Sequence, residues 1–218
     1  MREILLINPN TSVDTTAMMV AIAQTCAPNG YMVSGATAAR GVSMILDAER
    51  LQDASEEVIE SWKRHRGDLS GIVISAFGDP GIDMLRALTD VPIVGIFEAS
   101  LFEAAQGDRP FGIATVTPDL ADTIDANVQK VGLGRLYTGI RLTQGDPMTL
   151  VSDPARLEAA LADAVARCIA DDGARAVVIG GGPLGQAAVG LAHRFSVPVI
   201  APISAAMRRI SALLTMSS

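Results

Sequence analysis

GIVISAFGDPG, residues 71–81, is the stretch that decides the fold. It starts as an unbroken apolar run, which is typical of a strand covered on both faces of a parallel sheet. The run ends in small residues, and a proline and a glycine then lead into an amphipathic stretch. The pattern predicts a buried strand, a tight turn and a helix, in that order.

The same pattern returns about 105 residues later, where residues 176–185 read AVVIGGGPLG. Each copy is followed by a Val-Pro strand, VPIV at 91–94 and VPVI at 197–200. The first strand, with INPNT at 7–11, has its counterpart in ATVTP at 114–118. Only two copies exist, so we expect two pseudo-symmetric lobes rather than a solenoid.

Apolar runs alternate with amphipathic stretches along the whole chain, which predicts an α/β fold. Each lobe should be a short, mainly parallel sheet covered by helices. We expect strands at 3–8, 31–37, 71–76, 92–95, 111–115, 136–140, 176–179 and 198–200. We expect helices that start near Thr11 or Ser12 and after Pro183, and others at 51–66, 83–88, 119–131, 154–171 and 204–214. The first lobe should comprise 1–94 with a C-terminal helix at 203–218, and the second lobe 95–202.

Composition excludes several classes of protein. The net charge is −7 and the basic residues are scattered, which argues against a nucleic-acid surface. The basic cluster at 63–66 lies late in an expected helix, where it complements the helix C-terminus. No apolar run is long enough to span a membrane, and the N-terminus enters a strand directly, so we expect a cytoplasmic protein.

Ligands of open parallel sheets bind outside the carboxyl ends of the strands. Two related lobes that face each other would place four such ends around one cleft. The candidate binding residues at these ends are Asn8, Asn10, Ser12, Ser75, Ala76, Phe77, Thr115, Thr117, Gly180, Gly181 and Gly182.

Each strand-end motif has two interpretations. Asn10 and Ser12 could hold a carboxylate or imide oxygen at a helix N-terminus, or they could form a plain capping turn. Residues 180–182 could present backbone N–H groups to an anion, or could be a tight turn that needs positive φ. Asp79 could take part in chemistry, or could cap a helix that has Pro80 at its first position.

Cysteine and histidine do not form a recognisable catalytic or metal-binding pattern. Cys26 and Cys168 fall within expected helices, where buried structural cysteine is the simpler interpretation. His65 and His193 are also in or near helices, and His193 is expected to point away from the cleft. No zinc spacing or Ser-His-Asp order emerges.

Taken together, these segments resemble the aspartate/glutamate/hydantoin racemase superfamily, in particular its hydantoin- and allantoin-racemase branch. The motifs that carry the resemblance are INPNTS at 7–12, FGDPG at 77–81, VPIVGI at 91–96 with Glu98-Ala99 after it, and VPVI at 197–200. The resemblance implies two pseudo-symmetric lobes, no cofactor and no metal, a homo-oligomer, and a small anionic or imide substrate. It also implies that Asn10, Thr117 and the two strand-end loops contact that substrate.

Members of this superfamily carry one cysteine in each lobe, one to remove the Cα proton and one to return a proton on the opposite face. By resemblance, these positions fall on Ala76 and Gly181, neither of which can move a proton. Cys26 and Cys168 lie elsewhere. The resemblance therefore implies binding residues more directly than catalytic ones, and a route other than paired thiols.

Three functions follow as hypotheses. The first is isomerase-class proton chemistry on a small carboxylate, ureido acid or hydantoin, with Ser75, Asp79 or Glu98 as candidate catalytic groups. The second is a hydrolase or lyase that uses Ser75. The third is a non-catalytic binding protein that retains the cleft. Family frequency favours the first.

Overall fold

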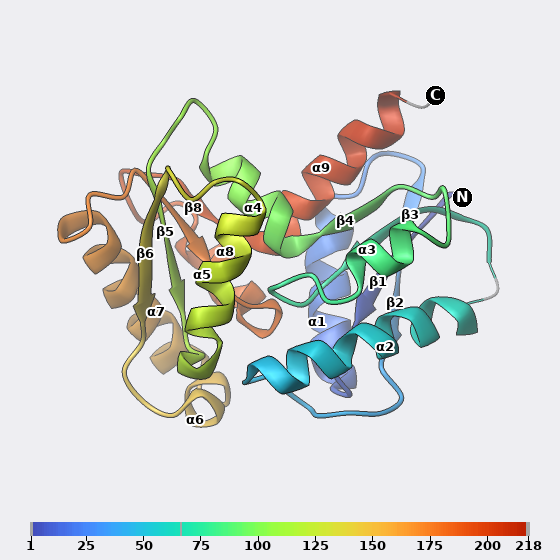
Figure 1. Cartoon of the computed structure of the whole chain (residues 1–218), viewed down its shortest axis with the longest axis horizontal. Coiled ribbons are helices and arrows are strands. Elements are labelled where there is room, and N and C mark those ends of the chain that lie inside the picture. The colour runs from blue at the N-terminus through green and yellow to red at the C-terminus, as the bar shows by residue number, and fades with distance from the viewer. Residues whose placement is uncertain (1, 66, 217–218) are drawn as a thin grey trace. The chain divides into compact units, whose positions relative to one another are not determined.

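The computed structural model describes residues 2–65 and 67–216. Arg66 of the expected helix at 51–66 and residues 217–218 of the expected C-terminal helix lie outside the described residues. The chain divides into two compact units (Figure 1): residues 1–99 with 203–218 form unit 1, and residues 100–202 form unit 2.

Unit 1 is built on a four-stranded sheet in the order β2-β1-β3-β4, and all neighbouring strands are parallel. The strands are β1 (Arg2–Asn8), β2 (Tyr31–Thr37), β3 (Leu69–Ile74) and β4 (Ile93–Gly95). Because they are parallel, their carboxyl ends share one edge. The continuous apolar runs predicted such a sheet, and the α/β fold is confirmed.

Helices cover both faces of this sheet, and alternate residues of each strand point to opposite faces. Ile4, Leu6 and Val73 face α1 (Val13–Thr25), the start of α4 (Ile96–Ala104) and α9 (Pro202–Met216). Leu5 and Ile72 face α2 (Ala48–Arg64) and α3 (Ile82–Arg86). Two cores, one on each face, hold the strand ends in place.

Unit 2 repeats the plan with a parallel sheet in the order β6-β5-β7-β8. The strands are β5 (Phe111–Thr115), β6 (Tyr137–Leu142), β7 (Ala176–Ile179) and β8 (Val199–Ile200). The helices are α5 (Ala121–Lys130), α6 (Pro147–Val151), α7 (Pro154–Ala170) and α8 (Gly185–Leu191), with short 3-10 turns at Pro118–Leu120 and Gly182–Leu184.

Helices α2 and α7 show how closely the two units correspond. Each has 17 residues, and each is capped by an aspartate side chain that accepts a backbone N–H, Asp47 in one and Asp153 in the other. The two caps are 106 positions apart (153 − 47). The repeat seen in the strand motifs therefore extends to a helix, and positions can be compared between the units.

Some expected elements differ from the observed ones. Strand β3 ends at Ile74, so Ser75 and Ala76 lie beyond the strand, in the turn that follows it. Helix α4 was not expected, because its apolar residues continue the pattern of β4, and α6 was not expected because it is a single short segment. Cys26 is the C-cap of α1 rather than an interior residue, and His193 follows the end of α8.

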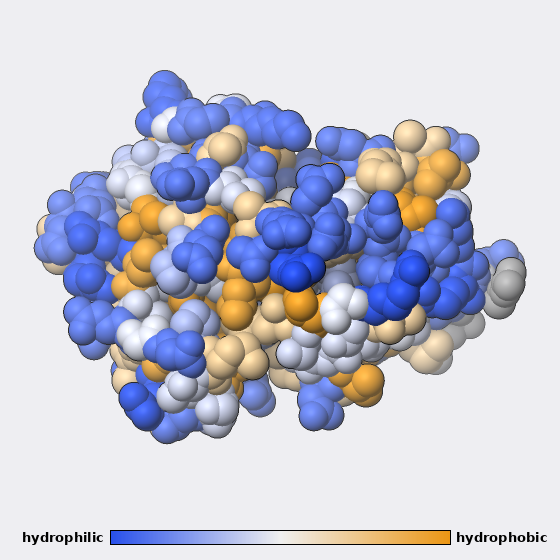
Figure 2. Space-filling view, turned by 60° about the horizontal axis from the view of Figure 1, so that its bottom comes forward, coloured by the Kyte–Doolittle hydropathy of each residue, from blue (hydrophilic) through white to orange (hydrophobic). Residues whose placement is uncertain are grey.

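Hydrophilic and apolar residues are interspersed over the face shown in Figure 2. The large apolar side chains that are exposed, such as Val13, Met84, Met148 and Met216, come from different helices. Among the described residues, no helix combines the length and hydropathy that crossing a bilayer requires.

Candidate functional site

The turn after β1 is organised by a buried asparagine. The Asn8 side chain is 1% exposed, and its Nδ2 donates to Asn10 Oδ1 (2.9 Å), Thr16 Oγ1 (2.9 Å) and the Ser12 carbonyl (3.2 Å). Asn8 Oδ1 accepts the backbone N–H of Asn10 (3.3 Å). Asn8 therefore shapes the turn, and its own hydrogen-bonding capacity is used within the unit.

Asn10 and Ser12 have different roles in this turn. Ser12 is the N-cap of α1, and its Oγ accepts from the backbone N–H (3.2 Å) and the hydroxyl (2.8 Å) of Thr15. This is the capping interpretation of Ser12. Asn10 uses only Oδ1, which accepts from Asn8 and from Ser12 N (2.9 Å). Within the described residues, Asn10 Nδ2 makes no hydrogen bond, so it is a side-chain donor without a partner in this turn.

The turn after β3 starts with a serine that is tied to β1. Ser75 is 2% exposed, and both its backbone N–H (2.9 Å) and its Oγ (2.8 Å) donate to the Ile7 carbonyl. The turn closes with a hydrogen bond from Asp79 N to the Ala76 carbonyl (3.0 Å). Ala76 and Phe77 are buried, and Phe77 packs edge-on against Phe97 with the ring centroids 4.9 Å apart.

The backbone N–H groups of Ala76, Phe77 and Gly78 make no hydrogen bond to any described residue. Buried backbone N–H groups without a partner are rare in proteins. Three in succession, next to two buried side chains and a glycine with φ of 129°, form a set of donors suited to an oxyanion. Ala76 and Phe77 were expected in the site from the sequence and Gly78 was not, and nothing in the sequence pattern pointed to their backbone as the active part.

Asp79 holds the start of α4. The side chain is 7% exposed, Oδ1 accepts from Phe97 N (2.9 Å) and Oδ2 accepts from Glu98 N (2.8 Å). Helix α3, whose N-cap is Gly81, has no side-chain cap, so the expectation that Asp79 caps the helix after Pro80 is wrong. Burial raises the pKa of Asp79 to about 8, although the two backbone N–H groups oppose the rise.

Gly95 makes this arrangement possible. A Cβ atom at Gly95 would lie 2.0–2.3 Å from the carboxylate atoms of Asp79, so only glycine leaves room for that carboxylate. The sequence contains Gly95 within the VPIVGI motif, but nothing in the pattern linked it to Asp79. A comparison of the two halves of the repeat could have revealed it, because the first half contains both an acid and a glycine at positions where the second half has neither.

Glu98 is engaged by an arginine of α3. Its Oε1 pairs with Arg86 Nη2 at 2.5 Å, and the same nitrogen donates to the carbonyl of Ile93 at the start of β4 (3.1 Å). Each of the three candidate catalytic groups, Ser75, Asp79 and Glu98, is therefore held by a partner within unit 1.

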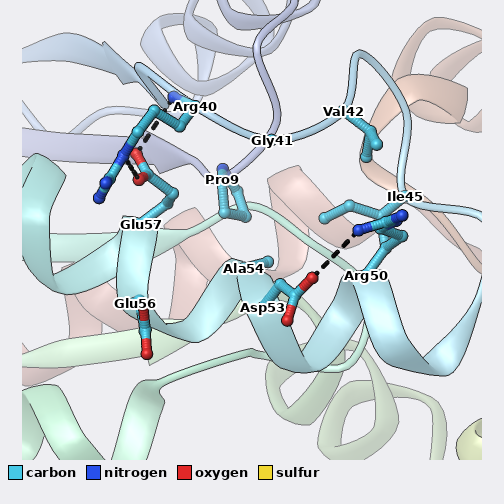
Figure 3. Close-up of a pocket in the computed structure, with 10 residues that line it drawn as sticks. All are labelled: Pro9, Arg40, Gly41, Val42, Ile45, Arg50, Asp53, Ala54, Glu56 and Glu57. Atoms are coloured by element: carbon cyan, nitrogen blue, oxygen red, sulfur yellow. Dashed lines mark hydrogen bonds and ion pairs between the residues drawn. The ribbon is translucent and has the colours of Figure 1, made fainter.

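A pocket of about 270 Å³ lies beside the turn after β1, between the loop at 38–47 and α2. Its lining residues are Pro9, Arg40, Gly41, Val42, Ile45, Arg50, Asp53, Ala54, Glu56 and Glu57. Figure 3 shows Arg40 and Arg50 on opposite sides, with Pro9 and Ala54 between them and Glu56 directed away. The loop is joined to the turn by a hydrogen bond from Thr11 N to the Val42 carbonyl (2.9 Å).

Glu57 fixes the beginning of this loop (Figure 3). Its side chain is 8% exposed, Oε1 accepts from Arg40 Nε (2.8 Å), and Oε2 accepts from the backbone N–H groups of Ala39 (3.2 Å) and Arg40 (3.4 Å). The sequence pattern gave no sign of this carboxylate, because a glutamate on an amphipathic helix is usually exposed.

In unit 2, a threonine ties the strand ends together. Thr115 Oγ1 donates to the Gly180 carbonyl (2.5 Å) and lies 3.2 Å from Thr117 Oγ1, while Gly180 N donates to the Ala114 carbonyl (2.8 Å). Thr115 and Thr117 are both buried. The two hydroxyls lie together, although the Thr115 hydroxyl is used within the unit.

The glycine turn at 180–182 repeats the turn at 75–77. Leu184 N donates to the Gly181 carbonyl (3.3 Å), as Asp79 N does to Ala76. Gly181 has a φ of 159°, which is close to extended, and Gly180 and Gly182 have no positive φ, so the tight-turn interpretation is wrong for those two. A Cβ atom at Gly181 would lie 3.0 Å from the Leu184 side chain.

Neither cysteine belongs to these turns. Cys168 is fully buried in α7, and burial raises the pKa of its thiol to about 12, so it is not a thiolate at neutral pH. Cys26 ends α1. Within residues 2–65 and 67–216, no group of three or more His, Cys, Asp or Glu residues is arranged to hold a metal ion.

Comparison with known proteins gives consistent results. The family model for "Asp/Glu/Hydantoin racemase" matches residues 4–210. The hydantoin racemase of Paenarthrobacter aurescens is 29% identical over 216 residues, which cover 98% of this chain and 92% of that protein. The hydantoin racemase of Pseudomonas sp. (strain NS671) is 27% identical over 209 residues, or 94% of this chain and 83% of that protein.

A solved structure agrees with these matches. The allantoin racemase from Klebsiella pneumoniae superposes with a TM-score of 0.91 at 27% identity, covering 100% of this chain and 89% of that chain. The two parallel sheets covered by helices are therefore the racemase architecture, and the suspected resemblance is confirmed. This chain belongs to the Asp/Glu/hydantoin racemase family.

Proposed function

We propose that this chain is a cofactor-independent, isomerase-class enzyme that exchanges the Cα proton of a small hydantoin, ureido acid or carboxylate by a route other than paired thiols. Its family membership and its similarity to hydantoin and allantoin racemases support the reaction and the substrate class. The proposal also places the protein in the cytoplasm as a homo-oligomer.

The observation that carries the proposal is the turn at 76–79, with its three unpaired backbone N–H groups. Loss of the Cα proton moves negative charge onto the adjacent carbonyl oxygen. Donors already in position stabilise that charge without reorganisation, and this electrostatic effect is usually the largest single contribution to such catalysis. Asn10 Nδ2 and the Thr117 hydroxyl are further candidate contacts for the polar groups of the substrate.

The carrier of the proton is the unusual part of the proposal. Ala76 and Gly181 stand where the superfamily resemblance places cysteines, and neither has an ionisable group. We propose that a hydroxide or water molecule takes the Cα proton and that water returns one to the carbanion. A positioned base typically contributes about 10²–10⁴-fold, so turnover should be correspondingly slow.

The hydrolase or lyase hypothesis has less support. A nucleophilic serine needs a base that accepts its proton. Ser75 Oγ donates instead to the backbone carbonyl of Ile7, and among the described residues no histidine or carboxylate is hydrogen-bonded to it. The binding-protein hypothesis is the second candidate, because neither strand-end position carries a proton carrier.

Deuterium exchange at Cα in heavy water tests the proposal. Hydantoins, ureido acids and dicarboxylates that stabilise the protein thermally are incubated with wild type, Ala76→Cys and the matched control Ala76→Ser. We expect slow exchange with wild type and the serine control, and exchange about 10²-fold faster with the cysteine variant. The cysteine fits because Ala76 already has a Cβ atom, to which only a sulfur is added.

One outcome would contradict the enzyme proposal. If ligands raise the melting temperature but wild type exchanges no proton above the uncatalysed rate, the chain is a binding protein. In that case the enzyme proposal is dropped.

A further inference from the structure

Asp79 occupies an unusual backbone position. It is the last residue of the turn at 76–79, and its φ of 49° is in the left-handed region that non-glycine residues rarely adopt. Such a conformation persists only where the surroundings determine it. Here the surroundings are the two backbone N–H groups that its carboxylate accepts, Phe97 N and Glu98 N.

The carboxylate therefore joins two separate parts of unit 1. One part is the turn after β3, which carries the unpaired N–H groups of Ala76, Phe77 and Gly78. The other is the first turn of α4, which follows β4 directly. The space for the carboxylate exists only because residue 95 is glycine. Phe77 and Phe97 pack against each other beside this connection and reinforce it.

We infer that Asp79 is a positioning residue, which holds the N–H groups of the turn at 76–79 in the orientation that receives the substrate oxyanion. The inference rests on the proposed function and assigns a residue that acts through the backbone rather than on the reacting atoms. It replaces the earlier hypothesis that Asp79 is itself a catalytic acid or base.

Two charged groups face Asp79 from the elements packed around it. Glu98, in the first turn of α4, raises the pKa of Asp79, and Arg86 of α3 lowers it, while burial gives the overall value of about 8. An ionised carboxylate is a stronger acceptor for backbone N–H groups than its protonated form. The turn should therefore be held most firmly above about pH 8, and ligand affinity should rise as the pH rises through that value.

The test compares ligand binding by wild type and Asp79→Asn. The probe is an N-carbamoyl amino acid, because its carboxylate does not titrate between about pH 6 and 9. The asparagine amide turns an N–H₂ group toward one of the two backbone donors, so we expect affinity at pH 9 to fall about tenfold, or about 1.4 kcal/mol. We also expect the pH dependence near 8 to disappear, which a purely structural role would not cause.

Asp172→Asn is the matched control. It removes a partly buried carboxylate that pairs with Arg141 in unit 2, at a place that the proposal does not use. We expect this variant to lose stability while the affinity and its pH profile remain those of wild type. Equal affinity and an unchanged pH profile in Asp79→Asn would overturn the inference.

A second variant covers the case in which Asp79→Asn does not fold. Arg86→Gln removes the positive charge that lowers the pKa of Asp79 and leaves the turn itself intact. The midpoint of the affinity profile should move to higher pH, and an unmoved midpoint would contradict the inference. Failure of the proposed function looks different: wild type would then exchange no Cα proton in the hydantoins, whether or not its affinity profile differs from that of Asp79→Asn.

Discussion

The carboxyl ends of the strands are held differently in the two units, although both sheets have the same parallel strand order. In unit 1, the turn after β3 ends in Asp79, which fits against Gly95. In unit 2, the equivalent turn ends in Leu184, and the residue that corresponds to Gly95 is Ala201. The acid and the glycine are thus replaced together by two buried apolar residues.

The same contrast appears between the two long helices. Glu57 of α2 is buried and accepts two backbone N–H groups from the loop after β2. Its counterpart in α7, 106 positions later, is Asp163, which is exposed and has no hydrogen bond to a described residue. Unit 2 folds without either carboxylate. We infer that both carboxylates fix the strand-end loops of unit 1.

The largest effect should come from placing the alanine of unit 2 at the equivalent position of unit 1. Gly95→Ala would place a methyl group 2.0–2.3 Å from the Asp79 carboxylate, and we expect the free energy of unfolding to fall by about 3 kcal/mol. Urea denaturation measures this change. The double variant Asp79→Leu, Gly95→Ala copies the pair in unit 2 and should recover part of the loss.

Ala201→Gly is the reciprocal change and the control. It adds only backbone freedom and removes one buried methyl, so it should cost about 1 kcal/mol. A Gly95→Ala variant that is no less stable than Ala201→Gly would show that the acid and the glycine are not coupled.

Much of this contrast lies outside what the sequence could predict. The parallel sheets, the repeat and the strand-end positions followed from continuous apolar runs and from motifs such as residues 71–81, because burial on both faces leaves a strong pattern. The contact between Asp79 and α4 did not follow, since it joins residues 18 and 19 positions apart and α4, which supplies the two donors, was not expected.

The sequence pattern also did not predict which backbone N–H groups lack a partner. The unpaired N–H groups of Ala76, Phe77 and Gly78 depend on where β3 ends, and the strand was expected to run two residues further. Placing Ala76 within a strand would pair its N–H with a neighbouring strand and so conceal its availability. The cleft expected between the two lobes stays a prediction.

The second comparison tests the buried glutamate. Glu57→Gln keeps the size of the side chain but turns an N–H₂ group toward the donors of Ala39 and Arg40, and we expect a loss of about 2 kcal/mol. Asp163→Asn, at the equivalent exposed position, should change stability by less than about 0.5 kcal/mol. Thermal unfolding of the two variants side by side provides the measurement. Equal losses would mean that the carboxylate of α2 does not hold the loop.

The smallest effect concerns the hydroxyl that joins the central strands in each unit. In unit 1, Ser75 Oγ donates to the Ile7 carbonyl, which also accepts Ser75 N. In unit 2, the donor comes from the opposite strand: Thr115 Oγ1 donates to Gly180, and among the described residues no other group donates to that carbonyl. Both bonds join the ends of the two central strands, but only one of them leaves an acceptor unpaired when it is removed.

Thr115→Val should therefore cost more than Ser75→Ala. Removing the Ser75 hydroxyl leaves the Ile7 carbonyl with its backbone partner, so the loss should be about 0.5 kcal/mol, whereas the buried Gly180 carbonyl loses its donor and the loss should be about 1.5 kcal/mol. Urea denaturation of both variants resolves a difference of about 1 kcal/mol. If the order is reversed, the Ser75 hydroxyl contributes more to the stability of unit 1 than this single connection between strands explains.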